Sequence, residues 1–574
     1  MLWLSLQFRC LQVITGDERC LFEAGRKLNS HHRLALAQWL AAHDKLDSTD
    51  YHQILSPLLA PPISHLSLDS SGLTDDLLSA LSQESFVLDL ESLSLCFSFR
   101  ASDTGMEALL AKMPHLKQLE LLELKIDGDP LCAFNSDCLE RIRLQLYVRD
   151  YQWKQMEDFF LRHRNLKSIA LATRGRTLPK EHALLMNITS GSASTLVELE
   201  LYNFTTEMGA LSTLLLGCVK LQKIKLAGSL QFDVDTMIRA KQICHWHTFE
   251  VSFQVTPPRD TYEALQYLPT SIQDLAFRFG PSNRNMIVSA ILNLCHLRAL
   301  KYHTEFFNDQ LTERLLTKLG SQLATIDIGL CDMLTDQGLG IIADHCNQGT
   351  LENLYIHSDT NKCNRVCTGM PLVRWLTDPN VAEKLTVLYL NHFRALAPEF
   401  LSVVASGCLN LEELHLRAVR AASDEFLLLL AANCKRLSSL DVGQCWAVTD
   451  RGLSAVARAL PLRYLNVSMC IRITTRSIEA LRENCFCLEH FLSHGTPNVD
   501  KRAVEELKNA CFGRLKSYYY HWLKPKVGAT NHRFLTATIK STLLDSKRRK
   551  EESNAPSKSA SGIESDHRKK RKLN

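Results

Sequence analysis

One short pattern recurs along most of the 574-residue sequence, and it limits the folds that the chain can adopt. The pattern is Leu-x-x-Leu-x-Leu, in which Ile, Val or an aromatic residue can replace a leucine. Its copies begin at Ile63, Leu90, Leu116, Leu139, Leu166, Leu196, Leu221, Trp246, Ile272, Leu297, Leu323, Leu351, Leu385, Leu411, Leu437, Leu462, Leu488 and Leu515. The intervals between these starts average about 26.6 residues, so the chain is an array of similar units.

Each unit combines a strand, a turn and a helix, as residues 437–461 illustrate. Leu437, Leu440 and Val442 alternate as in a strand with one buried side. Thr449 and Asp450 form a turn, and Asp450 can cap the helix that follows. The apolar residues of that helix are Leu453, Val456, Ala457 and Leu460. Because one unit cannot cover its own apolar side, neighbours must stack, which predicts an α/β leucine-rich-repeat solenoid, a horseshoe with parallel strands inside and helices outside.

The pattern divides the chain into four segments. Residues 1–62 precede the first repeat and are expected to form a helical N-terminal cap. Residues 63–521 should form the solenoid of about 18 repeats, followed by a C-terminal cap at 522–544. Residues 545–574 are rich in Ser, Lys, Glu and Pro and are expected to be disordered. This tail has a net charge of +5 against +4 for the whole chain, so the body is almost neutral.

Cysteines recur at two positions of the unit, after the strand and at the end of the helix. The unit that begins at Leu323 has both, Cys331 and Cys346, with Thr335-Asp336 and Gly338-Leu339 between them. The other repeat cysteines are Cys408, Cys434, Cys445, Cys470 and Cys485. The arrangement resembles the cysteine-containing repeats of the F-box/LRR proteins, the substrate receptors of cullin-RING ubiquitin ligases, strongly over residues 300–520 and loosely over 63–300. Cysteines one repeat apart predict rows of buried, reduced thiols and no metal site.

The third, fifth and seventh positions of each unit are expected to line the concave surface, because alternate strand residues point the same way. Tyr, His, Asn and Arg gather there in the later units, a composition typical of binding hot spots. The candidate substrate-binding residues are Tyr355, His357, Tyr389, Asn391, His415, Arg417, Asp441, Tyr464, Asn466, Tyr519 and His521. The alternative is an ordinary solvated strand surface, which explains the polarity but not the tyrosines.

The longest interval between starts, 34 residues, follows Leu351 and contains an insertion at residues 357–384. Cys363 and Cys367 lie in it, but Cys-x-x-x-Cys without a second pair at ligand spacing is a weak zinc signal. A surface loop with two incidental thiols is the expected structure. Long loops on solenoids often carry contacts, so a role in partner binding remains open.

The N-terminal segment lacks the features of an F-box but contains another motif. There is no Leu-Pro-x-Glu, and Trp39 stands alone on an apolar helix face. Residues 5–14 instead resemble the BC-box of elongin-binding helices, in which Leu6, Cys10 and Ile14 would lie above one another at i, i+4 and i+8. This resemblance implies elongin B/C with cullin-2 as partners, whereas an F-box would imply the F-box adaptor with cullin-1.

The cullin box expected downstream of a BC-box is incomplete. Residues 54–59 contain Pro57, but Ser56 precedes it where an aliphatic residue is expected. The alternative for the N-terminal segment is therefore an ordinary amphipathic cap that covers the first repeat.

The tail contains two basic clusters that predict binding to a nuclear import receptor, and hence a location in both cytoplasm and nucleus. The clusters consist of Lys547, Arg548, Arg549 and Lys550, and of Arg568, Lys569, Lys570, Arg571 and Lys572. Direct nucleic-acid binding is not expected, because no aromatic residues interleave to stack on bases. A merely solubilising tail is the alternative.

The remaining sequence features bear on the class of function. No run of eighteen apolar residues occurs, and the N-terminus is interrupted by Arg9, so neither a membrane span nor a signal peptide is expected. No Gly-rich phosphate loop, His-Glu-x-x-His or nucleophile elbow indicates an enzyme or a cofactor. The sequence predicts the substrate-recognition subunit of a cullin-RING ubiquitin ligase, which holds a target protein for ubiquitin-dependent degradation. The alternative is a protein-interaction scaffold without a ligase.

Overall fold

The computed structural model describes residues 63–511 with short gaps, together with Arg33, Ala37, Leu58 and Leu59, all within one compact unit, Met1–Tyr518. The gaps are residues 70–73, 97–100, 123–129, 147–152, 174–180, 206–207, 256, 279–283, 305–306, 330, 332, 347–348 and 359–363. The expected C-terminal cap, the basic tail and nearly all of the expected N-terminal cap lie outside the described residues. Among the helices that the structure describes, none combines the length and apolar composition needed to cross a membrane.

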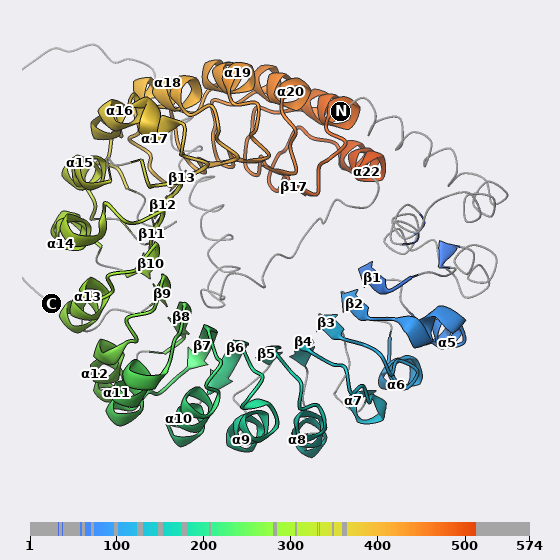
Figure 1. Cartoon of the computed structure of the whole chain (residues 1–574). Coiled ribbons are helices and arrows are strands. Elements are labelled where there is room, and N and C mark those ends of the chain that lie inside the picture. Colours follow the sequence, from blue (N-terminus) through green and yellow to red (C-terminus); the bar gives the residue numbers. More distant parts are fainter. Residues whose placement is uncertain are drawn as a thin grey trace, which may run out of the picture. The chain divides into compact units, whose positions relative to one another are not determined.

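The strands form one parallel sheet in which each strand pairs with the next one along the chain (Figure 1). They are β1 (His65–Asp69), β2 (Ser92–Cys96), β3 (Gln118–Leu122), β4 (Arg141–Leu146), β5 (Ser168–Thr173), β6 (Glu198–Thr205), β7 (Lys223–Ser229), β8 (Thr248–Phe253), β9 (Asp274–Arg278), β10 (Ala299–His303), β11 (Thr325–Gly329), β12 (Asn353–His357), β13 (Val387–Asn391), β14 (Glu413–His415), β15 (Ser439–Asp441), β16 (Tyr464–Asn466) and β17 (His490–Leu492). Each strand begins two residues after a predicted repeat start, so the predicted leucine-rich-repeat solenoid is confirmed. The last predicted start, Leu515, lies outside the described residues.

Helices cover one side of this sheet, because consecutive parallel strands need a crossover connection (Figure 1). They are α5 (Asp75–Ser82), α6 (Asp103–Leu110), α7 (Pro130–Ala133), α8 (Trp153–Arg162), α9 (Glu181–Ser192), α10 (Met208–Gly217), α11 (Val234–Ile243), α12 (Arg259–Ala264), α13 (Arg284–Leu292), α14 (Asp309–Leu319), α15 (Asp336–His345), α16 (Met370–Leu376), α17 (Pro379–Ala382), α18 (Pro398–Gly407), α19 (Asp424–Asn433), α20 (Asp450–Ala459), α21 (Thr475–Asn484) and α22 (Lys501–Ala510). Two 3-10 helices, η2 (Ser85–Asp89) and η3 (Leu265–Tyr267), complete the described elements. The long insertion accommodates both α16 and α17 in the crossover from β12 to β13.

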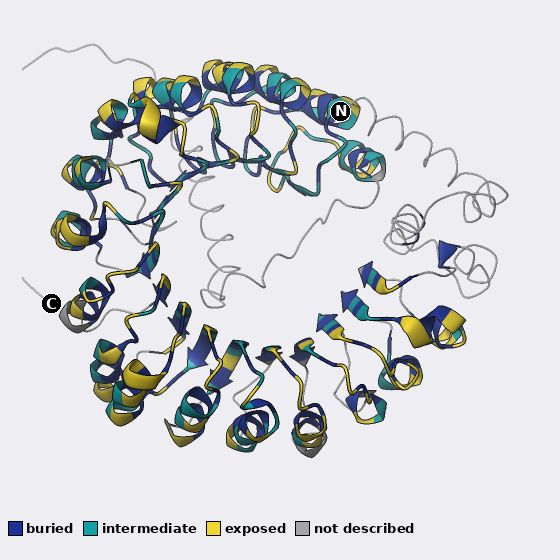
Figure 2. Ribbon diagram, in the orientation of Figure 1, coloured by how far each residue is buried: buried dark blue, intermediate teal, exposed yellow. Residues whose placement is uncertain are grey.

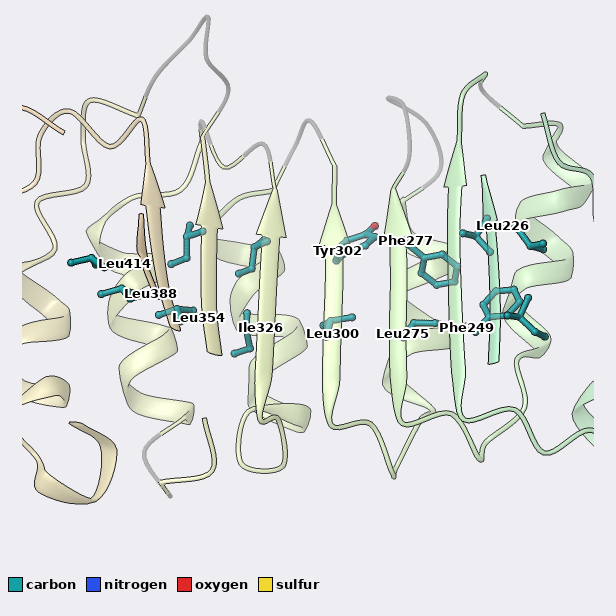
Figure 3. Close-up of a cluster of buried hydrophobic side chains, with 14 of the residues drawn as sticks. Leu226, Phe249, Leu275, Phe277, Leu300, Tyr302, Ile326, Leu354, Leu388 and Leu414 are labelled. Carbon is teal, nitrogen blue, oxygen red and sulfur yellow. The ribbon is translucent and has the colours of Figure 1, made fainter. Parts of the chain in front are cut away.

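The leucines of the repeat form the hydrophobic core between the sheet and the helices. On successive strands, equivalent apolar side chains lie side by side, as Figure 3 shows for Leu275, Leu300, Ile326, Leu354 and Leu388. All five are at most 4% exposed. Each helix buries the side that faces the sheet and leaves its opposite side exposed (Figure 2). Since burial of one such side chain stabilises a fold by about 1.5–3 kcal/mol, the repeated leucines determine which side of every strand faces the helices.

Neighbouring helices are joined at their N-terminal ends by a repeated contact between an aspartate and a threonine. Thr449 caps α20, and its backbone N–H donates to Asp424 Oδ1 of the preceding helix at 2.8 Å. Thr474 donates in the same way to Asp450 at 2.7 Å. The prediction that Asp450 caps its own helix is therefore wrong: Thr449 is the cap, and Asp450 binds the cap residue of the next repeat.

The repeat cysteines are buried and unpaired by disulfides. Several of their thiols donate to backbone carbonyls of the preceding repeat, for instance Cys470 to Val442 at 3.1 Å and Cys485 to Ala457 at 3.3 Å. Burial raises the pKa of Cys470 to about 11. A protonated thiol is a donor and a poor metal ligand, so these side chains fit a structural role.

Within the insertion, Cys367 differs from the surface thiol that the sequence suggested. Its side chain is fully buried and donates to the Leu334 carbonyl at 3.2 Å. The neighbouring Asn364 side chain is also buried, and its amide donates to the carbonyls of Cys331 and Leu334. This part of the insertion is therefore core, whereas Cys363 lies outside the described residues. In the described part of the chain, no group of three or more His, Cys, Asp or Glu side chains could hold a metal ion.

Candidate functional site

The candidate site lies on the open face of the sheet, which we define as the strand side chains that point away from the helices. These are the third, fifth and seventh residues of each repeat, for example Asn353, Tyr355 and His357 on β12. On β12 these three alternate with the buried Leu354 and Ile356. The repeat pattern therefore decides which side chains the open face presents.

Aromatic rings form a continuous row across the open face from β12 to β17. The Tyr355 and Tyr389 ring centroids are 4.6 Å apart, edge to face. His415 stacks on Tyr389 at 3.8 Å and lies 5.4 Å from Tyr464, with nearly parallel planes on both sides. His490 continues the row 6.3 Å beyond Tyr464. We call these five residues the ring row. Parallel strands lie about 4.8 Å apart, so the equivalent side chains of Tyr355, Tyr389 and His415 meet at stacking distance. Tyr464 and His490 lie two residues earlier in their repeats, and His415 reaches Tyr464 across β15, which contributes no ring.

The tyrosines of the ring row are half-buried, and their hydroxyl groups stay protonated. The Tyr389 hydroxyl donates to Glu413 Oε2 at 2.5 Å. Burial, this hydrogen bond and the charge of Glu413 raise the pKa of Tyr389 well above its ordinary value. Burial and then the charge of Glu413 raise the pKa of Tyr355 to about 12. The row therefore offers apolar ring faces with fixed polar groups at their rims, which is the combination that suits a protein interface.

A buried carboxylate joins two histidines at the start of the row. Asp327 on β11 contacts His303 Nε2 of β10 at 2.7 Å and His357 Nε2 of β12 at 3.4 Å. Burial lowers the pKa of His303, so its imidazole is neutral near pH 7 despite the opposing charge of Asp327. Burial alone would raise the pKa of Asp327, but the two histidines outweigh it and hold that pKa below its usual value. The three groups are fixed in place by one another.

Two predicted contact residues, Asp441 and Asn466, are buried, and their side chains are hydrogen-bonded within the protein. Asn466 donates to Asp441 at 2.9 Å, and Asp441 accepts the backbone N–H of Gly443 at 2.8 Å. Asn466 in turn accepts the backbone N–H of Ser468 at 3.0 Å. Asp441 and Asn466 are only 5% and 2% exposed, so the prediction that they line an accessible surface is wrong. Their short side chains instead satisfy backbone groups at the ends of β15 and β16.

Asn391 and Arg417 have intermediate exposure, as does His415 of the ring row itself. Asn391 accepts the backbone N–H of Arg417 at 2.9 Å, and His415 contacts Ser439 Oγ at 3.0 Å. The Arg417 Nε atom is buried without a hydrogen-bond partner among the described residues. Arg417 therefore keeps binding capacity that the described part of the fold does not use.

The remaining predicted site residues cannot be placed. The BC-box-like residues Leu6, Cys10 and Ile14, together with Tyr519 and His521, lie outside the described residues. The same holds for the import clusters Lys547, Arg548, Arg549, Lys550, Arg568, Lys569, Lys570, Arg571 and Lys572.

The earlier strands carry a charged ladder on the open face that sequence analysis missed. Arg143 on β4 reaches Glu120 on β3 at 3.5 Å and Glu200 on β6 at 3.7 Å, spanning the small Ala170 of β5. Lys225 on β7 then pairs with Glu200 at 2.6 Å. The alternation of charge at the fifth repeat position was a usable sequence signal. These charges neutralise one another, whereas the ring row consists of tyrosine and histidine rings.

Comparisons with known proteins concern the fold. No protein-family profile and no curated protein matches the sequence. Among solved structures, the chain is similar to the yeast Rad7 and Elc1 complex, at 16% identity and a TM-score of 0.31 over 87% of this chain and 90% of the other. It is also similar to the TLR13–ssRNA13 complex (14%, 0.40, covering 80% and 63%) and to a leucine-rich-repeat protein of Leptospira interrogans (15%, 0.28, covering 78% and 94%). The strand and helix arrangement described above identifies the chain as a leucine-rich-repeat solenoid.

Proposed function

We propose that this protein is a non-catalytic receptor that holds a target protein against the ring row. The observation that carries the proposal is the chain of ring contacts from Tyr355 to His490, in which five half-buried rings span β12 to β17 and bridge β15, which contributes no ring. Rings that already stack in the free protein lose little conformational entropy when a partner covers them. Aromatic side chains held in this way are frequent sources of binding energy.

We further propose that the receptor delivers its target to a cullin-RING ubiquitin ligase. The support is the BC-box-like pattern at Leu6, Cys10 and Ile14 and the resemblance of the cysteine-containing repeats to those of F-box/LRR proteins. In this function the solenoid positions a target near ubiquitin-transfer enzymes carried by other subunits, so its contribution is proximity. The basic clusters at 547–550 and 568–572 would bring the receptor to nuclear as well as cytoplasmic targets. The second candidate is an interaction scaffold that binds targets on the same surface without a ligase.

The ring row is tested by comparing the partners of matched variants. The double variant Tyr389→Ala with Tyr464→Ala removes two rings, whereas Tyr267→Ala removes an exposed tyrosine of η3 on the helix side. Each is used as bait for quantitative mass spectrometry, after circular dichroism has shown that it is folded. We expect a set of proteins that wild type and Tyr267→Ala retain and the double variant loses. A double variant that is folded and loses no partner would exclude the ring row as the target site.

The ligase assignment is tested separately by co-purification of adaptors. Wild type is compared with Leu6→Ala/Cys10→Ala and with Gln7→Ala/Gln12→Ala, which alters residues off the predicted contact line. We expect elongin B/C to co-purify with wild type and with the glutamine control only. Co-purification of the F-box adaptor instead would keep the ligase function but overturn the role of Leu6, Cys10 and Ile14. If neither adaptor binds wild type, the scaffold function replaces the ligase function.

A further inference from the structure

A second exposed surface follows from the connections that lead from β12–β16 to the next helices. Parallel backbone pairing of Asn364 with Phe393 places Arg365 beside Arg394. The strand registers from β13 to β16 continue into hydrogen bonds beyond the strand ends, such as Ala418 N–H to Gly443 O at 2.8 Å. When these registers are extended, the same position of five successive connections is occupied by Arg365, Arg394, Arg420, Trp446 and Ile471. We call this row the arginine edge.

The backbone has the same conformation in these repeats, which supports the register. The residue two places before each of the last four members has a left-handed φ, between 62° and 67°, although none is glycine. These residues are His392, Ala418, Gln444 and Met469. A left-handed conformation at four equivalent non-glycine positions needs a common local structure to stabilise it. The side chains of the arginine edge therefore start from equivalent backbone positions.

The arginine edge is positively charged and lacks internal counter-charges. The connections 391–397, 416–423, 442–449 and 467–474 contain four arginines and no Asp or Glu. Within the described part of the chain, the guanidinium groups of Arg365, Arg394 and Arg420 make no ion pair or hydrogen bond. These arginines are available to an anionic partner.

Among the described residues, the carboxylates in the first turns of the helices that follow these connections are mostly already bound. Asp332 and Asp359, in the connections before and around Arg365, lie outside the described residues. Asp424 and Asp450 accept from Thr449 and Thr474, as described above. Glu425 pairs with Arg451 at 3.6 Å, which leaves the exposed Glu399. These side chains therefore do little to neutralise the arginine edge.

Three arginines outside the arginine edge pair with carboxylates of neighbouring repeats. Arg436 lies 3.6 Å from Glu412, and Arg463 lies 2.6 Å from Glu489. In the last helices, Arg482 contacts Glu506 at 2.7 Å. Each of these three arginines is thus balanced by a carboxylate of a neighbouring repeat. These three arginines thus differ from Arg365, Arg394 and Arg420, which contact no carboxylate in the described part of the chain.

The other half of the arginine edge is apolar and exposed. Trp446 and Ile471 are exposed large apolar side chains, with 50% and 48% of their surface accessible. They occupy the register positions directly after the three arginines. A basic stretch followed by an exposed apolar stretch matches a ligand that is acidic at one end and apolar at the other.

We propose that the arginine edge binds an acidic segment of a partner protein that carries apolar side chains at one end. Its carboxylates contact Arg365, Arg394 and Arg420, and its apolar residues cover Trp446 and Ile471. Nucleic acid fits less well, because one aromatic side chain in five positions provides little base stacking. The surface is distinct from the ring row, so the inference does not depend on the target site proposed above.

The test uses full-length protein and fluorescein-labelled twelve-residue peptides in fluorescence anisotropy. Two probes contain six glutamates, with two leucines at the N-terminal or the C-terminal end, and matched peptides replace glutamate by glutamine. A thymidine oligonucleotide of equal charge is the third class of probe. The variant Arg365→Gln/Arg394→Gln/Arg420→Gln is compared with Arg436→Gln/Arg463→Gln/Arg482→Gln, which changes the net charge equally. Trp446→Ala tests the apolar half, and Tyr389→Ala tests independence from the ring row.

We expect an acidic probe to bind wild type and the glutamine probes to bind at least tenfold more weakly. Removing the three unpaired arginines should weaken the acidic probe about tenfold or more, since each exposed charge contact contributes roughly a factor of two to five. The paired-arginine variant and Tyr389→Ala should stay within twofold of wild type. Trp446→Ala should weaken the leucine-containing probes severalfold.

Four outcomes would overturn the inference. These are no binding of either acidic probe to wild type at 100 µM, wild-type affinity in the triple variant, an equal loss in the paired-arginine variant, and tighter binding of the oligonucleotide than of the acidic probes. An equal loss in the paired-arginine variant would show that net charge alone explains the binding of the acidic probe. Tighter binding of the oligonucleotide would identify a nucleic-acid surface.

Discussion

The same substitution at two glycines of helix α15 should have opposite effects on stability. A Cβ atom at Gly338 would overlap Asp309 Oδ1 and Leu334 Cδ1. At Gly340, the nearest atom to such a Cβ is Pro371 Cβ at 3.8 Å, an ordinary contact. Gly338→Ala and Gly340→Ala therefore share the helix, the chemistry and the gain in helix propensity, and differ only in the space around the new methyl group.

Asp309 is not free to move aside, because its carboxylate accepts the backbone N–H and the hydroxyl of Thr335 at 2.8 and 2.5 Å. Losing one such hydrogen bond costs about 1.5–3 kcal/mol, and crowding against the buried Leu334 costs about 1–3 kcal/mol. Replacing a helical glycine by alanine stabilises the helix by about 1 kcal/mol, because alanine has the higher helix propensity. Gly338→Ala should therefore lower the free energy of unfolding by roughly 1.5–5 kcal/mol, whereas Gly340→Ala should raise it by up to about 1 kcal/mol.

The assay is urea unfolding followed by circular dichroism, with hydrogen exchange of α14 and α15 as a local measurement. Neighbouring repeats stabilise one another, so the loss should be largest in the amides of these two helices. Equal stability of the two variants, or a more stable Gly338→Ala, would refute the idea that the aspartate–threonine contact joins adjacent repeats. Asp309→Asn should reproduce part of the loss without adding volume.

Two further predictions concern titratable groups. Alkylation by iodoacetamide at pH 7.5, located by mass spectrometry, should be at least tenfold slower at Cys445 and Cys470 than at the exposed Cys132, Cys138 and Cys295. Burial raises the pKa of Cys445 and Cys470 and excludes the reagent from both thiols. Equal alkylation rates in the native protein would contradict the structural role of the two buried thiols. Acidification from pH 7.5 to 5 should weaken hydrogen-exchange protection of β10–β12 after correction for intrinsic rates, since the pKa of His303 is lowered in the fold and unfolding takes up a proton below the usual histidine value. The lowered pKa of Asp327 acts in the same direction, but only below about pH 4. His303→Gln should remove most of the effect between pH 7.5 and 5, and protection that rises on acidification would contradict the sign.

The candidate site was predicted only in part. The sequence correctly indicated that tyrosines and histidines of the later repeats share one side of the sheet, because strand alternation follows from the leucine spacing. It did not indicate that Asp441 and Asn466 are consumed by backbone hydrogen bonds, nor that Asp327 holds two histidines. The backbone hydrogen bonds of Asp441 and Asn466 are local, to residues two positions further along. The Asn466–Asp441 and histidine–Asp327 contacts instead join different repeats, so those partners cannot be read from one repeat alone.

The sequence by itself determined the repeat and its phase. Seventeen strands begin where the leucine pattern places them, since exchanging the buried and open sides of any strand would expose its leucines. The tertiary structure alone decided how polar groups on neighbouring repeats are paired. It assigned Asp450 to the next helix, buried Cys367, stacked His415 on Tyr389 and left Arg394 and Arg420 without carboxylates. Burial depends on composition that each repeat carries, whereas hydrogen bonds and ion pairs depend on the geometry between repeats.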